Sequence, residues 1–358
     1  LFFRFGYLLL EYLLKAFLPI TVVSILFFDI LDKKISKEFI IKILFLIVLY
    51  FIFTILLWPY LWSAPLANFI KAFLIFSDYI IDIKFLFNSD YVSSKNLPYS
   101  YLPVWISIST PFVTQLLFII GYIFYTKVFF NRLVSIEKSN DYNLWKGQNE
   151  KQDFFIFFNL TIILIYLILS NAVLYNGWRQ VYFLNVFIIY FTTYGINTLV
   201  KNVSLIKRFS KYFYLFIIFS LITIFYNIYK LHPFQSLYFN NLVKKNVYEK
   251  FEVDYWGLSG KKFLIKIVEL ENNKKVNIGV ASWVPLERSI ALLDDTVKSK
   301  INIVGQEYKT ADYIFSNNVT EVNSLVNKKY LIPKNFKKVD ELVVNNILIY
   351  AVYKNDSQ

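Results

Sequence analysis

The chain contains no cysteine and no methionine, and His232 is its only histidine among 358 residues. The absence of cysteine excludes disulfides, thiolate metal sites and a cysteine nucleophile within this chain. A single histidine excludes the usual zinc sites built from several histidines. The sequence also lacks the Gly-x-Gly-x-x-Gly and phosphate-loop patterns, so no motif indicates a nucleotide site.

Charged residues are scarce as well, at 18%, whereas hydrophobic residues make up 57% and the mean hydropathy is +0.47. A soluble domain averages ~45–50% apolar residues. The excess lies before residue 230, which indicates an integral membrane protein. In a membrane protein the positions of Lys and Arg indicate which loops are cytoplasmic, so we interpret the net charge of +13 in terms of topology. We expect no nucleic-acid partner. The chain starts Leu-Phe-Phe-Arg without a signal-peptide pattern, and we interpret it as a fragment of a longer protein.

Six apolar segments predict membrane-spanning helices, because about 20 apolar residues cross a bilayer. They cover approximately residues 8–30, 39–62, 104–126, 154–174, 181–200 and 212–229. Residues 64–88 are also apolar, but Lys71, Asp78, Asp82 and Lys84 interrupt them. Positions 71, 78 and 82 share one helical face, which predicts an interfacial helix that lies along the membrane.

The basic residues alternate between the two sides of this predicted bundle. Loops 32–38, 127–152 and 201–211 hold twelve Lys and Arg, whereas loops 62–103 and 171–180 hold four. Cytoplasmic loops are enriched in Lys and Arg, so the basic loops are expected inside. The chain is then expected in a bacterial inner membrane, with residues 1–230 as a truncated transmembrane domain and residues 231–358 outside.

Residues 231–358 predict a membrane-junction segment followed by a small extracytoplasmic α/β domain. The expected helices are 261–272, 285–294 and 321–328, and the expected strands are 275–282, 301–304 and 311–316. Residues 341–353 predict a hairpin that turns at Asn345-Asn346. The fold class is thus an α-helical multi-pass membrane protein with a small α/β domain.

Aromatic and polar side chains gather in the loops expected on the outer face. Interfacial anchoring explains most of the tryptophans and tyrosines there. It does not explain Arg179, Gln235 and Asp254 among them, because Arg suits phosphate oxygens and a carboxylate can bind sugar hydroxyls or act as a base. A substrate-binding site is therefore predicted from Asp78, Tyr99, Tyr101, Trp178, Arg179, His232, Gln235, Asp254, Tyr255 and Trp256.

Two of these residues have other interpretations. A Ser-His-Asp triad of Ser236, His232 and Asp254 is conceivable, but no nucleophile-elbow pattern accompanies it. His232 better suits a helix C-terminal cap or a hydrogen-bonded structural role. Asp254 could equally cap the helix that begins near Leu258.

Five motifs in order resemble the C-terminal half of bacterial multi-pass glycosyltransferases of the GT-C class, similar to glycosyltransferase family 39, the dolichyl-phosphate-mannose–protein mannosyltransferases. The motifs are Leu57-Trp-Pro-Tyr-Leu-Trp-Ser-Ala-Pro65, Leu97-Pro-Tyr-Ser-Tyr-Leu-Pro-Val-Trp105, Tyr175-Asn-Gly-Trp-Arg179, His232-Pro-Phe-Gln235 with Tyr238-Phe-Asn240, and Asp254-Tyr-Trp-Gly257.

The resemblance implies sugar transfer from a polyprenyl-phosphate donor to an acceptor on the outer face. Family members use an acidic residue of the first outer loop as catalytic base, which is expected upstream of residue 1. The expected partners are membrane lipid, the lipid-linked sugar and an acceptor that is a glycan, lipid or protein. A divalent metal ion is compatible with such transfer, although no ligand cluster argues for one. The alternatives are a non-catalytic membrane scaffold with an outer interaction domain and, second, a transporter.

Overall fold

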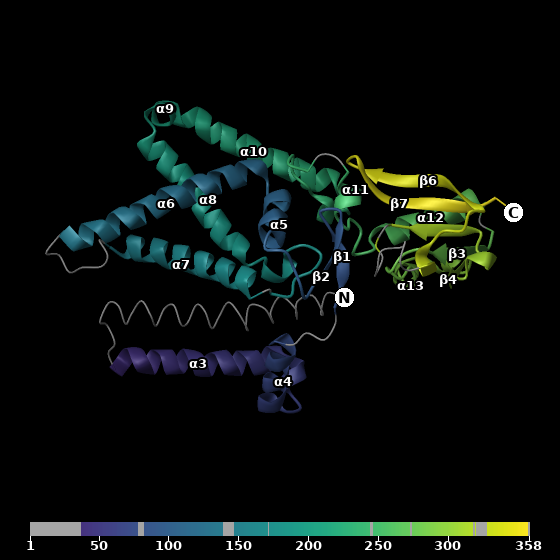
Figure 1. Ribbon diagram of the computed structural model, residues 1–358, viewed down its shortest axis with the longest axis horizontal. Coiled ribbons are helices and arrows are strands. Elements are labelled where there is room, and N and C mark those ends of the chain that lie inside the picture. Colours follow the sequence, from purple (N-terminus) through teal and green to yellow (C-terminus); the bar gives the residue numbers. More distant parts are fainter. Residues whose placement is uncertain are drawn as a thin grey trace. The chain divides into compact units, whose positions relative to one another are not determined.

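The computed structural model describes residues 37–77, 82–138, 147–170, 172–243, 246–272, 274–317, 319 and 328–356 (Figure 1). The chain divides into two compact units. The described parts of the first unit lie within Leu1–Ile81, Val113–Ala172 and Trp178–Ser210. The second unit comprises Asp82–Phe112, Val173–Gly177 and Lys211–Gln358.

The first unit is helical. Its helices are α3 (Lys37–Leu57), α4 (Pro65–Ser77), α6 (Phe112–Lys138), α7 (Gln148–Leu169), α8 (Leu184–Asn202) and α9 (Ser204–Arg208). Short 3₁₀ turns, η2 (Pro59–Leu61) and η3 (Arg179–Val181), precede α4 and α8. Two of these helices contain segments long and apolar enough to cross a membrane, Phe112–Val134 and Asn149–Leu169.

Helices α6 and α8 cross at two glycines. A Cβ on Gly121 would lie 1.9 Å from the Phe191 carbonyl oxygen, and a Cβ on Gly195 would lie 2.3 Å from the Leu117 carbonyl oxygen. Small residues allow helix backbones to approach closely in membranes, where dispersion contacts hold helices together. The ring of Phe191 packs beside this crossing, with its centroid 5.8 Å from that of Tyr125.

The second unit contains the third candidate span, α10 (Ser210–Lys230). None of the residues of α10 is buried, and Phe225 and Tyr229 expose 70% and 82% of their surface. An apolar face of this extent indicates contact with lipid or with another protein. The described chain is thus mostly helical, with three helices long and apolar enough to span a membrane and a small sheet domain.

The region before α6 forms a hairpin and a short helix. Strand β1 (Lys84–Phe87) pairs antiparallel with β2 (Asp90–Ser93), and α5 spans Tyr101–Ser109. After α10 come the turn η4 (Gln235–Leu237) and α11 (Val247–Lys250), and Phe251 bridges to Phe87 of β1.

The sheet domain follows at once. Its strands β3 (Val276–Val280), β4 (Ile301–Gly305), β5 (Tyr313–Ser316), β6 (Phe336–Val344) and β7 (Ile347–Asn355) are arranged in the order β4-β3-β5-β7-β6. The first three strands are parallel, and β7 and β6 are antiparallel to their neighbours. Helix α12 (Ser259–Leu270) is amphipathic and buries Phe263, whose ring contacts those of Phe315 and Tyr350.

Several predicted elements of this domain are confirmed. Helix α12 and strands β3, β4 and β5 begin and end within two residues of their predicted bounds. The hairpin turns at Asn345 and Asn346, whose φ values of 52° and 63° place both in the left-handed region. The predicted helix 285–294 is wrong in length, because α13 covers only Glu287–Ile290 and α14 (Asp295–Lys298) is separate. Of the predicted helix 321–328, only Lys328 is described, and it begins the turn η6 (Lys328–Tyr330).

Two membrane predictions need correction. The predicted helix 64–88 is wrong at its end, because residues 84–87 are a strand paired with β2. The predicted span 104–126 is divided at Thr110 and Pro111 between α5 and α6, since proline cannot continue the helix before it. Helix α3 holds only a shorter apolar stretch, Ile43–Leu57, and the predicted span 8–30 lies outside the described residues.

Candidate functional site

The second unit gathers four segments that are far apart in sequence around one group of rings. We call this group the aromatic cluster; it consists of Phe85, Phe87, Tyr101, Trp105, Phe239 and Phe251. The ring centroids of Phe87 and Tyr101 are 4.9 Å apart, and those of Trp105 and Phe251 are 5.1 Å apart. Phe239 stacks on Phe251 with 5.9 Å between centroids. Such pairs contribute about 0.5–1.5 kcal/mol each beyond their buried area.

Side-chain hydrogen bonds to backbone carbonyls join these segments. The hydroxyl of Tyr101, which is 1% exposed, donates to the Gly177 carbonyl oxygen at 3.0 Å. The buried amide of Asn240 donates to the carbonyl oxygens of Ser107 and Thr110 at 2.5 and 2.7 Å. The end of α5 is therefore fixed to the segment that follows α10.

Glu252 lies beside the aromatic cluster and was not among the predicted site residues. Its carboxyl group accepts a hydrogen bond of 2.9 Å from the Asn176 side-chain amide and another from the Leu86 backbone N–H. Burial raises the pKa of Glu252 from 4.5 to about 8, against the smaller opposing effect of these two hydrogen bonds. The shift favours the neutral carboxyl group, which can donate a hydrogen bond.

Two further polar atoms in this region are buried. Within the part of the chain that the structure describes, the indole nitrogen of Trp105 and the side-chain oxygen of Asn176 make no hydrogen bond. Buried polar atoms are normally satisfied by protein or by ordered water. A donor and an acceptor thus accompany a protonated carboxyl group, a combination that suits hydroxyl-bearing ligands. No sequence pattern singled out Glu252, because a lone glutamate carries no signal of its burial.

Asp254, a predicted substrate-binding residue, is 4% exposed and hydrogen-bonds to other residues of the sheet domain. Its carboxylate accepts hydrogen bonds from the Ser259 hydroxyl, the Ser259 N–H at 3.4 Å and the Asn317 amide at 3.1 Å. Burial raises the pKa of Asp254 to about 6, and these hydrogen bonds oppose the rise. Ser259 is the first residue of α12, so Asp254 holds the start of that helix, as the alternative interpretation of this residue expects.

Tyr255 and Trp256 lie on the exposed side of the same turn. The Tyr255 ring packs against Trp256 and Trp283, with centroid distances of 5.4 and 6.3 Å. Gly257 adopts a φ of 63° directly after them, a conformation that glycine accepts at no steric cost.

His232 and Gln235 contact each other after the end of α10. The Gln235 side-chain nitrogen lies 2.8 Å from Nδ1 of His232, and the His232 N–H donates to the Tyr229 carbonyl oxygen. His232 is exposed, and these contacts fit a hydrogen-bonded residue at a helix end. Because the His232 ring contacts Gln235 while the Asp254 carboxylate bonds Ser259 and Asn317, the structure gives the triad no support.

The remaining predicted residues are distributed over both units. In the first unit Trp178 is buried, with its ring 5.1 Å from that of Tyr182, and Arg179 is partly buried at the start of η3. In the second unit Tyr99 is exposed beside α5. Asp78 lies outside the described residues. A single pocket that unites Arg179 with the residues of the second unit stays a prediction.

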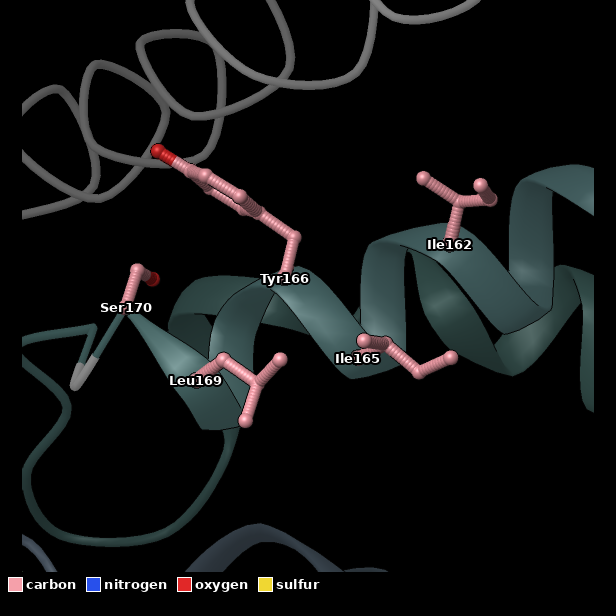
Figure 2. Close-up of a pocket in the computed structure, with 5 residues that line it drawn as sticks. All are labelled: Ile162, Ile165, Tyr166, Leu169 and Ser170. Atoms are coloured by element: carbon pink, nitrogen blue, oxygen red, sulfur yellow. The ribbon is translucent and has the colours of Figure 1, made fainter.

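A hollow of about 450 Å³ lies on α7 and is lined by Ile162, Ile165, Tyr166, Leu169 and Ser170. Figure 2 shows that all five side chains come from this one helix and its C-terminal end. The lining is apolar except for the hydroxyl groups of Tyr166 and Ser170, so it offers contact area rather than chemistry.

Metal-binding side chains do not assemble in the described regions, where no three His, Cys, Asp or Glu residues come together. No protein-family model, curated protein or solved structure matches the chain. Function must therefore be argued from the residues themselves.

Proposed function

We propose that this chain is part of a membrane glycosyltransferase that moves a sugar from a polyprenyl-phosphate donor to an acceptor outside a bacterial inner membrane. Six spans and an extracytoplasmic C-terminal domain belong to this proposal. Three apolar helices and the small sheet domain support its coarse outline.

The observation that carries the proposal is the convergence of motifs in the second unit. Segments around Tyr101, Asn176, Asn240 and Phe251 come from four separate parts of the chain and meet at the aromatic cluster. Glu252 in its protonated form and the Asn176 side-chain oxygen lie beside this cluster and offer hydrogen-bond partners that suit sugar hydroxyls. Three of these segments, around Tyr101, Asn176 and Asn240, lie in motifs that carry the family resemblance.

In this function the residues of this chain bind and orient the substrates. Arg179 would contact the donor phosphate, because its guanidinium offers a planar fork of donors to phosphate oxygens. Glu252 in its protonated form would donate a hydrogen bond to a sugar hydroxyl.

The test uses the full-length protein in liposomes with a panel of radiolabelled polyprenyl-phosphate hexoses. We expect release of polyprenyl phosphate from one of these donors. Arg179→Ala should weaken donor binding about 10- to 100-fold, the range for a lost hydrogen bond to a charged group. Arg208→Ala, on α9, is the matched control and should bind as the unsubstituted protein does.

A folded protein that consumes none of these donors would end the proposal. Unchanged donor binding by Arg179→Ala would remove only that residue from the site.

A non-catalytic scaffold is the second candidate, and one observation favours it. Asp254, the carboxylate of the Asp254-Tyr-Trp-Gly257 motif, is buried and holds the start of α12. This contact links the motif to the architecture of the sheet domain, as a scaffold would require. The same liposome assay separates the two candidates, because a scaffold leaves every donor intact.

A further inference from the structure

The sheet domain exposes a group of aromatic and apolar side chains at the start of α12. We call it the aromatic ledge; it consists of Tyr255, Trp256, Leu258 and Trp283. Trp256, Leu258 and Trp283 expose 38%, 43% and 43% of their surface. The Tyr255 ring lies between the two indoles and contacts both. Large apolar side chains that gather at a protein surface mark an interaction site.

Contacts within the sheet domain hold the backbone of the ledge in place. The Trp283 backbone N–H donates to the Val319 carbonyl oxygen at 2.8 Å. Asp254 connects the turn beneath the ledge to Ser259 and Asn317. A Cβ on Gly257 would lie 2.3 Å from the Val284 side chain, so the turn packs directly on the Trp283 segment. These contacts order the exposed rings before any partner binds, which lowers the entropy cost of binding.

Basic groups adjoin the ledge. Lys261 and Lys262 follow Leu258 in the first turn of α12, and both are exposed. The N-terminus of α12 adds a partial positive charge at the same end. Tryptophan and tyrosine prefer the membrane–water interface, and lysines beside them attract anionic lipid headgroups. The chemistry of the ledge therefore matches the headgroup layer of a phospholipid bilayer.

The chain also holds this surface near a bilayer. Tyr255 follows Lys230, the last residue of the candidate span α10, by 25 positions, and both lie in the second unit. A short tether gives the ledge a high effective concentration at the membrane surface. Weak contacts that would not recruit a free domain are then sufficient to dock this one.

We propose that the aromatic ledge docks the sheet domain on the headgroup layer of the bilayer that α10 spans. A sugar ring is the competing occupant. Sugar recognition needs polar groups beside the rings to bond the hydroxyls, whereas the polar atoms of Asp254, Ser259 and Asn317 are buried and bonded to one another. The inference requires the membrane span but not glycosyl transfer.

The test measures lipid contact in the full chain. Because this chain has no cysteine, Leu258→Cys provides a single site for a nitroxide label on the ledge. Val339→Cys, on exposed strand β6, is the matched control in the same domain. Each labelled protein is placed in nanodiscs of mixed zwitterionic and anionic phospholipid. Collision rates with lipid-soluble oxygen and with a water-soluble nickel chelate are then compared by electron paramagnetic resonance.

We expect the oxygen-to-nickel collision ratio at position 258 to exceed that at position 339 severalfold. Adding Trp256→Ala and Trp283→Ala should return the ratio at 258 to the control value. Equal ratios at the two positions would overturn the proposal, even if the double variant did not fold. Shielding of the label at 258 from both probes by soluble oligosaccharides, without lipid contact, would assign the ledge to sugar instead.

Discussion

Glu252 should make the stability of the second unit depend on pH in a predictable direction. Because the pKa of Glu252 is raised, the folded chain between pH 4.5 and about 8 retains a proton that the unfolded chain has already released. Stability is therefore fully present below the lower value and is lost as the pH rises through the upper one. Glu252→Gln keeps a neutral group of similar size that can still accept from Asn176, and it should remove this loss.

The magnitude follows from the two pKa values. At 1.36 kcal/mol per pH unit, the interval from 4.5 to about 8 corresponds to at most about 5 kcal/mol. Glu252 is only partly buried by exposed area, and hydration of its ionised form reduces the effect to about 2–3 kcal/mol. For a unit of this size, that difference corresponds to about 4–12 °C in melting temperature.

The assay is thermal unfolding of the protein in nanodiscs at several pH values from 5 to 9. The melting temperature of the unsubstituted protein should fall relative to that of Glu252→Gln as the pH rises. Asp254 titrates in the same direction, with a pKa of about 6, but it is common to both proteins and cancels in the difference. Glu249→Gln, an exposed glutamate of α11, is the control and should follow the unsubstituted protein. If the melting temperatures of the unsubstituted protein and of Glu252→Gln changed identically with pH, Glu252 would not be the source of the pH dependence.

Three further predictions concern stability, each measured by thermal unfolding in nanodiscs. Gly121→Ala should destabilise the protein by about 1–3 kcal/mol through overpacking, since the new Cβ would lie 1.9 Å from the Phe191 carbonyl oxygen. The control Gly147→Ala, which has nothing within 4 Å of its Cβ, should be nearly neutral. Equal effects of the two substitutions would contradict the α6–α8 crossing. Asp254→Ala should cost about 3–5 kcal/mol, because it leaves its buried hydrogen-bond donors without an acceptor; a cost under about 1 kcal/mol would contradict this role. Asn345→Val should cost about 1–2 kcal/mol, because a β-branched residue is strained at a φ of 52°, and an unchanged melting temperature would argue against this turn.

Features that depend on a local residue pattern could be predicted from the sequence alone. The apolar excess before residue 230 predicted membrane helices, and three candidate spans are present among the described residues. The amphipathic period predicted α12, and two adjacent asparagines predicted the turn between β6 and β7. These succeed because helix periodicity and left-handed turn residues act over a few neighbouring positions.

The burial of polar groups and their contacts, in contrast, became known only from the folded chain. The apolar run 64–88 looks helical, yet Lys84–Phe87 is a strand because it pairs with β2 and bridges to Phe251. Asp254 resembled a ligand residue in the sequence, but Asn317, 63 positions away, takes part in holding it. Glu252 carried no signal because its pKa depends on burial and on Asn176, 76 positions earlier. Such environments are created by contacts between distant segments, which no local pattern encodes.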